Sequence, residues 1–266
     1  MSASEVLQVE RRGEIEIVTL NRPDSLNALD PALTEAFVAY WTRLQSDQSV
    51  RVVILRAAGR AFCAGLDLKG WGDFSSEPSV ANGAYMQRTI GGIVRLMRSC
   101  PQPIISLVQG SAAGGGMSIA LATDVRYGTP DMRMNAAFIK IGLGGGDIGS
   151  SYFLPRLVGH SLASELLLTG RFIHAERALR AGLISEILGP DAILDAGLAL
   201  AEDMLLTSPM ALRMTKDILN LNIDANSLDA AMAIEDRQQV MLTNTADHAE
   251  AVAAFLQKRK PVWSGK

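Results

Sequence analysis

Cysteine, histidine and long apolar runs are all scarce in this sequence, and each scarcity argues against a class of protein. The two cysteines, Cys63 and Cys100, belong to no CxxC pair, so the sequence indicates neither a disulfide framework nor a zinc site. The three histidines are scattered, which argues further against a metal centre. No uninterrupted apolar run approaches the roughly 20 residues that cross a bilayer. We therefore expect no bound metal and no membrane-spanning helix.

An excess of charge of one sign is also missing. The net charge is −3, the isoelectric point is near 5.7, and no extended block of lysine and arginine is present. Duplex nucleic acid and anionic membranes require such a basic surface, so neither is an expected partner. The N-terminus lacks a basic segment followed by an apolar one, which predicts a cytoplasmic location. The 266 residues, 48% of them hydrophobic, suffice for one large core with a small appendage.

Short strands and helices alternate through the first 155 residues. Two β-rich runs separated by a turn are followed by a helix whose expected start is the Asp30-Pro31 step, with proline at the first helical position. Apolar residues recur on one face of that helix: Leu33, Phe37, Tyr40, Trp41 and Leu44. Further expected strands lie at 52–58, 103–110 and 125–137, with helices at 85–99 and 117–124. This alternation predicts an α/β core.

The segment after Pro155 is dominated by helical periodicity punctuated by glycine and proline. Mixed strands and helices followed by a helical tail favour an α/β spiral over a doubly wound nucleotide fold. No GxxxxGK[ST] motif is present, and the one GxGxxG match, Gly144 to Gly149, has no β-rich run directly before it. A nucleotide-binding loop is therefore not indicated.

Two glycine-rich junctions, residues 61–69 and 110–118, are the most informative features of the sequence. Each is expected to end a strand and begin a helix, where backbone N–H groups are free and the helix end is positively polarised. If the two junctions converge, one N–H from each can bind the oxygen of a thioester carbonyl as it becomes an enolate, a contribution of about 3 kcal/mol per donor. The alternative is that these glycines only make tight turns and close helix packing.

Together the two junctions, AFCAGLDLK and GSAAGGGMS, resemble the signature of the crotonase (enoyl-CoA hydratase/isomerase) superfamily. The resemblance extends over essentially the whole chain, from LNRP at 20–23 to FLQKRKP at 255–261. It implies a ClpP-like spiral of ββα repeats, with an acyl-CoA-binding core at residues 1–200 and a helical trimerisation region at 201–266. It also implies a homotrimer or a dimer of trimers acting on an acyl-CoA thioester, with no cofactor apart from the coenzyme A of the substrate.

The resemblance also assigns roles to residues. The N–H groups of Leu66 and Gly115 match the oxyanion pair. Gly114, Gly115 and Phe138 are also expected to bind the substrate, with Phe138 lining the acyl pocket. The positions that contact coenzyme A in the family correspond to Ser25, Leu26, Ala28, Ala64, Leu66, Asp67, Leu68 and Lys69. Alternatives remain at two of them, because Lys69 could be merely solvated and Asp67 could act mainly as a helix-start residue.

The catalytic carboxylates depart from the hydratase pattern. Ser118 and Phe138 stand where hydratases carry two glutamates, and neither a hydroxyl nor a phenyl ring is an acid or base near neutral pH. Asp147, in a glycine-rich loop before a helix, matches a third family position that is acidic in dienoyl-CoA isomerases, 3-hydroxyisobutyryl-CoA hydrolases and 4-chlorobenzoyl-CoA dehalogenases. We predict that Asp147 is catalytic, the alternative being a helix cap.

A single acid suits proton transfer between carbons better than addition of water, so the resemblance predicts a double-bond isomerase or an atypical hydratase in acyl-CoA and fatty acid metabolism. Two alternatives stay open. In one, Asp147 is the nucleophile of a thioester hydrolase or dehalogenase. In the other, the fold retains coenzyme A binding but has lost its catalysis and serves as a scaffold.

Overall fold

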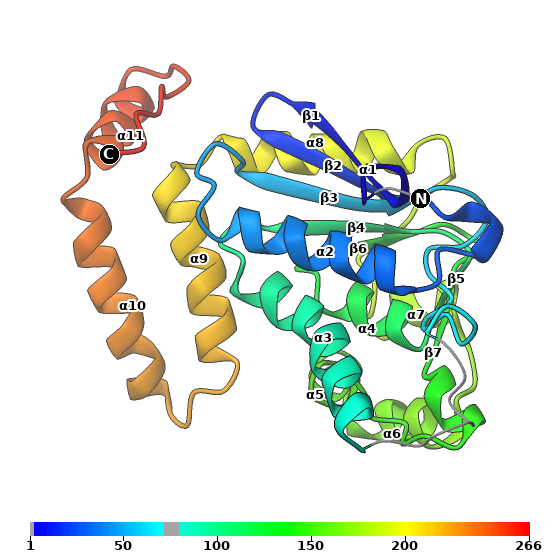
Figure 1. The fold of residues 1–266 in the computed structure, drawn as a ribbon. Helices are drawn as coiled ribbons and strands as arrows, with labels where there is room; N and C mark the ends of the chain where they lie inside the picture. The colour runs from blue at the N-terminus through cyan, green and yellow to red at the C-terminus, as the bar shows by residue number, and fades with distance from the viewer. Residues whose placement is uncertain (1–2, 72–79) are drawn as a thin grey trace.

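The larger β-sheet forms the centre of the molecule. The computed structural model describes residues 3–71 and 80–266. Six strands follow the order β1-β2-β3-β4-β6-β9 (Figure 1). Only the β1–β2 pair is antiparallel, and the other neighbours run parallel. The strands are β1 (Leu7–Arg12), β2 (Ile15–Leu20), β3 (Val52–Ala57), β4 (Ile104–Val108), β6 (Val125–Gly128) and β9 (Glu186–Ile187).

A second sheet of three short strands lies beside the glycine-rich junctions. Its order is β5 (Ser111–Ala113), β7 (Arg133–Asn135) and β8 (Ile173–His174). The sequence predicts no strand within the junction at 110–118, whereas β5 pairs with β7 and forms an isolated bridge from Ala112 to Cys63. The pairing partners of β5 are distant in sequence, so local composition does not reveal this strand.

The helices alternate with these strands and then dominate the chain. Asp30 caps α2 by accepting a hydrogen bond from the N–H of Leu33 at 2.8 Å, and the predicted apolar face of this helix is buried. The first helices are α1 (Ala3–Val6), α2 (Pro31–Leu44), α3 (Val80–Ser99) and α4 (Gly115–Leu121). The later ones are α5 (Ser150–Val158), α6 (His160–Thr169), α7 (Ala175–Arg180), α8 (Ile193–Leu205), α9 (Pro209–Asn222), α10 (Leu228–Thr243) and α11 (Ala246–Leu256). Two 3-10 helices are η1 (Pro23–Ser25) and η2 (Ala137–Ile141).

Two apolar cores lie on opposite faces of the larger sheet. Helices α2, α3 and α4 cover one face, and α8 covers the other (Figure 1). Side chains of β2 point to both faces of the sheet. Val18 and Leu20 belong to the first core, and Ile15 and Ile17 belong to the second. The α/β class is thus as predicted.

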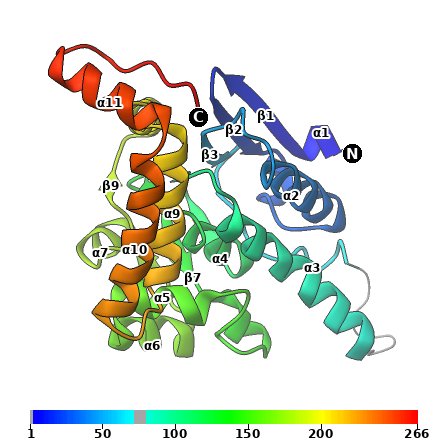
Figure 2. The ribbon, with the colours of Figure 1, turned by 90° about the vertical axis from the view of Figure 1, so that its left-hand side faces the viewer.

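The C-terminal helices extend from this core. Figure 2 shows α9 and α10 side by side, with α11 at their end. The helix α8 runs through residue 200 to Leu205, and the division at that residue stays a prediction. Large apolar side chains are exposed on this region: Leu219, Leu221, Leu228, Val240, Met241, Phe255 and Leu256.

Lys216 attaches α9 to the core. Its buried ammonium group lies 2.9 Å from Asp124 and donates to the carbonyls of Gln102 and Met97 at 2.7 and 3.3 Å. Replacing it with methionine keeps most of the apolar stem of the side chain but leaves both carbonyls without this donor. We expect Lys216→Met to lower the free energy of unfolding by about 2–3 kcal/mol.

Urea denaturation at one protein concentration measures this loss, with Lys260→Met as the matched control. Lys260 is exposed, so its replacement is expected to leave stability nearly unchanged. Equal stability of the two variants would contradict an anchoring role for Lys216.

Candidate active site

The two glycine-rich junctions lie against each other. The N–H of Cys63 donates to the carbonyl of Ser111 at 3.1 Å, and the N–H of Ala113 donates to the carbonyl of Cys63 at 2.9 Å. A methyl group added at Gly65, whose φ is +96°, would lie 3.3 Å from the backbone nitrogen of Gly115. One added at Gly116 would lie 2.1 Å from the carbonyl oxygen of Cys63. Glycine is therefore required where the two backbones approach.

Two backbone donors stand free at this contact. Within the described part of the chain, neither the N–H of Leu66 nor that of Gly115 donates to an acceptor. Gly115 is the first residue of α4, where backbone N–H groups have no partner inside the helix. The arrangement leaves two unpaired donors in neighbouring turns, one from each junction.

The expectation that the first junction enters a helix is wrong for the residues that the structure describes. Residues 68–71 form a turn, because the carboxylate of Asp67 accepts hydrogen bonds from the N–H groups of Lys69 and Gly70 at 3.2 and 3.0 Å. Aspartate commonly closes such turns in competition with a helix. The N–H of Leu66 therefore lies at a turn rather than at a helix start, and Asp67 is not a helix-start residue.

Asp67 also holds the first junction to the loop at 22–30. Its carboxylate lies 3.1 Å from the guanidinium of Arg22, which also contacts Asp30 at 3.0 Å. Burial opposes ionisation of Asp67, but the hydrogen bonds from Arg22 and from the turn outweigh it and lower the pKa of this carboxyl. Asp67 is thus a charged link between two loops.

The loop at 22–30 has an unusual backbone that side chains hold in place. Leu26 and Asn27 have φ values of +51° and +54°. The buried amide of Asn27 accepts from the N–H of Arg22 at 2.7 Å and donates to the carbonyls of Ala58 and Ala61, both at 2.9 Å. These bonds account for the left-handed conformation, which is uncommon outside glycine.

The predicted coenzyme A positions therefore lie on two joined segments. The N–H of Ala64 donates to the carbonyl of Leu26 at 3.0 Å, and the N–H of Leu29 donates to that of Gly65 at 2.7 Å. On these segments Ser25, Leu68 and Lys69 are exposed, Leu26, Ala64 and Leu66 are half-buried, and Ala28 is buried.

Ser118 and Phe138, which stand where hydratases carry two glutamates, lie beside the contact between the two glycine-rich junctions. Ser118, fully buried on α4, donates its hydroxyl to the backbone carbonyl of Asp147 at 3.2 Å. The ring of Phe138, buried on η2, lies 3.4 Å from a methyl group added at Gly114. Neither side chain can act as an acid or base near neutral pH.

Asp147 is half-buried in the loop before α5. Its Oδ1 atom accepts hydrogen bonds from the side-chain amide of Gln87 and from the N–H of Ile148, the latter at 2.8 Å. The helix begins only at Ser150, with Gly149 as its N-cap and no side-chain cap. The helix-cap alternative for Asp147 is therefore wrong. Among the described residues no donor contacts Oδ2, which stays available to a ligand.

Ile148 connects Asp147 to the two free donors. Its Cδ1 atom lies 3.5 Å from a methyl group added at Gly115, and its Cγ2 atom lies 3.6 Å from one added at Gly91 on α3. The φ of Ile148 is +36°, a strained value for a β-branched residue. Such strain concentrates at functional sites, where the surrounding structure maintains it.

Gln87 is a member of the site that the sequence does not reveal. It lies on the long amphipathic helix α3, 60 positions before Asp147, and no motif distinguishes it. Only the packing of α3 against the loop before α5 brings the two side chains together.

A cavity of about 410 Å³ lies between α3 and α5, next to Asp147. Its lining residues are Gln87, Arg88, Gly91, Val94, Arg95, Arg98, Ile148, Gly149, Tyr152 and Phe153. Gln87 and Ile148, the two residues that contact the Asp147 carboxylate, thus also line the cavity.

Comparison with known proteins identifies the family. The pattern of the enoyl-CoA hydratase/isomerase family matches residues 10–266. The "Probable enoyl-CoA hydratase EchA12" of Mycobacterium tuberculosis is 37% identical over 267 residues, which cover 99% of this chain and 94% of the relative. The 1,2-epoxyphenylacetyl-CoA isomerase of Escherichia coli is 32% identical over 249 residues, or 94% of each chain. The crystal structure of the enoyl-CoA hydratase from Bacillus anthracis superposes with a TM-score of 0.92 at 28% identity, covering 98% of this chain and 100% of that one.

The chain therefore belongs to the enoyl-CoA hydratase/isomerase family and has the crotonase fold. Its relatives include proteins named as hydratases and as isomerases. In residues 3–71 and 80–266, no helix has the length and apolar character needed to cross a membrane. The same residues contain no group of three or more histidine, cysteine, aspartate and glutamate side chains placed to hold a metal ion.

Proposed function

We propose that this enzyme moves a double bond within an enoyl thioester of coenzyme A. In this reaction the N–H groups of Leu66 and Gly115 hold the thioester oxygen as it becomes negative. The observation that supports it best is the free oxygen of Asp147 in a loop whose Ile148 side chain packs beside Gly115, the residue with the free N–H. Donors placed where charge develops supply one of the largest contributions to catalysis.

The Asp147 carboxylate carries the proton in this proposal. It takes a proton from one carbon of the acyl chain, which leaves a dienolate, and returns the same proton to a second carbon. The thioester stays intact throughout, and no water or oxidant enters. Oδ2 performs both transfers, since Oδ1 is occupied by Gln87 and by the N–H of Ile148.

Addition of water is the less favoured reaction. A hydratase must hold a water molecule and activate it, and Ser118 and Phe138 provide no carboxylate for that purpose. An atypical hydratase would have to rely on Asp147 alone.

Coenzyme A is the proposed ligand of the two joined loops, which carry Ser25, Leu26, Ala28, Ala64, Leu68 and Lys69. The exposed Lys69 would meet a phosphate, whereas Asp67 would act through the loop position that it fixes. We propose that no further cofactor takes part and that the protein acts in the cytoplasm.

We also propose that residues 201–266 assemble three copies, or two sets of three, around the core at 1–200. The large apolar side chains exposed on α9, α10 and α11 support this, because exposed apolar surface is commonly buried in an interface between subunits.

Release of free thiol distinguishes the proposed isomerase from a hydrolase in which Asp147 is the nucleophile. With 3-hexenoyl-CoA we expect conjugation of the double bond, seen as rising ultraviolet absorbance, without any increase in free thiol. Cys63 and Cys100 are both buried, so a thiol reagent reports mainly on coenzyme A. Thiol release at the rate of substrate loss would establish the hydrolase. No change with 3-hexenoyl-CoA, 2-hexenoyl-CoA or a dienoyl-CoA would favour a scaffold.

A further inference from the structure

The cavity beside Asp147 is formed on one side by a single face of α3. Residues at positions 87, 88, 91, 94, 95 and 98 line it, and this spacing places them along one side of a helix. The loop and first turns of α5 form the other side, with Ile148, Tyr152 and Phe153. Since the cavity begins at the residues that hold the Asp147 carboxylate, it is a natural extension of the site proposed above for the reacting end of the acyl chain.

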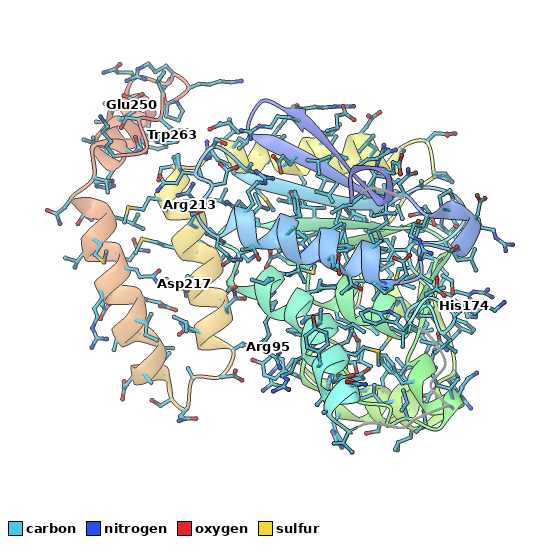
Figure 3. All side chains as sticks on the ribbon, in the orientation of Figure 1. Arg95, His174, Arg213, Asp217, Glu250 and Trp263 are labelled. Atoms are coloured by element: carbon cyan, nitrogen blue, oxygen red, sulfur yellow. The ribbon has the colours of Figure 1, made fainter. Side chains whose placement is uncertain are left out.

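Three arginines line this cavity, and two of them have no carboxylate partner among residues 3–71 and 80–266. Arg98 pairs with Asp124 at 3.1 Å, whereas Arg88 makes only a hydrogen bond to the carbonyl of Ala84. Arg95 makes no hydrogen bond or ion pair within the described residues, and Figure 3 shows it leaving α3 on the side away from the sheet. Both unpaired side chains are exposed, so a ligand can reach them without breaking an ion pair.

No acidic side chain among the described residues lines the cavity to balance these charges. The carboxylates of Asp147 and Asp224 lie outside this lining. Asp147 accepts from Gln87 at the near end, and Asp224 beyond the far wall accepts from the hydroxyl of Tyr152 and pairs with Arg156 at 2.8 Å. A concave site with uncompensated charge of one sign attracts a ligand of the opposite sign.

We propose that the substrate of this enzyme carries a second carboxylate on its acyl group, bound by Arg88 and Arg95. The proposal rests on the function proposed above. Val94, Ile148 and Phe153 offer apolar surface to the carbon chain, while a guanidinium binds a carboxylate through two parallel hydrogen bonds. Arg88 and Arg95 are seven residues apart, about 10.5 Å along the helix axis, so acyl chains of different lengths can reach one or the other.

Binding of unreactive saturated thioesters tests this directly. Calorimetry would compare hexanoyl-CoA with adipoyl-CoA, and octanoyl-CoA with suberoyl-CoA, so that each pair differs only by a terminal methyl or carboxylate. We expect the carboxylate to improve affinity by about tenfold in the wild type at low salt, for at least one length. The double variant Arg88→Gln/Arg95→Gln should lose that preference and keep the affinity for the methyl-ended thioester.

Arg180→Gln provides the matched control, since Arg180 is exposed on α7 and does not line the cavity. It should retain the full preference. Equal affinity for both members of each pair in the wild type overturns the proposal, as does a preference that survives in the double variant. A double variant whose only change is a smaller assembly mass also overturns it, because the arginines would then belong to a contact between copies. Failure of every thioester to bind would instead reject the acyl-CoA function itself.

Discussion

Replacing Asp147 with asparagine is expected to lower turnover of an enoyl or dienoyl thioester by about 10³-fold, the usual size of a lost general acid or base. The amide oxygen of asparagine can accept the same two hydrogen bonds from Gln87 and Ile148, so the loop should keep its conformation. Its nitrogen would occupy the place of Oδ2, and an amide nitrogen cannot take a proton from carbon. Affinity for a saturated thioester should therefore change little.

Steady-state rates from ultraviolet absorbance, together with calorimetric binding of hexanoyl-CoA, separate the two effects. Asp191→Asn is the matched control, because it removes the same charge from an exposed position outside the site. Wild-type turnover in Asp147→Asn would remove Asp147 from the mechanism. A loss of binding as large as the loss of turnover would indicate that Asp147 positions the ligand rather than the proton.

The sequence predicts those parts of the fold that depend on neighbouring residues. The cap and apolar face of α2 follow from Asp30, Pro31 and a regular spacing of large side chains, and the structure contains both. The strand before the first junction and the long helix α3 are equally local patterns. Each is determined by periodicity or by a capping residue, which are properties of a short stretch of chain.

Parts that depend on distant contacts are not predicted. The turn after Leu66 replaces an expected helix because the Asp67 carboxylate closes it locally while Arg22 holds that carboxylate from another loop. Likewise, β5 exists because Ala112 pairs with Met134 and Cys63, neither of which is nearby in sequence.

The same distinction holds for the residues of the candidate site. Its glycines can be predicted from the sequence, since close approach of two backbones at Gly65 and Gly116 tolerates no side chain. Gln87 cannot be predicted in this way, because glutamine is common on the exposed face of a helix. Only the position of the loop before α5 shows that Gln87 contacts Asp147.

Gly115→Pro offers the most direct test of the proposed oxyanion site, because it removes one backbone donor from an otherwise intact helix. Gly115 is the first residue of α4, where proline needs no hydrogen-bond donor and its fixed φ suits the helix. The preceding residue is Gly114, which has no Cβ for the proline ring to meet. We expect turnover to fall by about 10²–10³-fold, the loss seen when one oxyanion donor is removed.

Gly115→Ala is the matched control, since alanine keeps the N–H. The added Cβ would lie 3.1 Å from Cδ1 of Leu29, the end of a side chain that can move by a few tenths of an ångström. Alanine should therefore retain most of the activity, and both variants should bind free coenzyme A as the wild type does, because the loops at 22–30 and 61–71 are unchanged. If the proline variant turns over substrate as fast as the alanine variant, the N–H of Gly115 does not hold the developing charge. The oxygen of the intermediate would then have to be bound by other donors, and the free amide of Gly115 would be no more than the unpaired start of a helix.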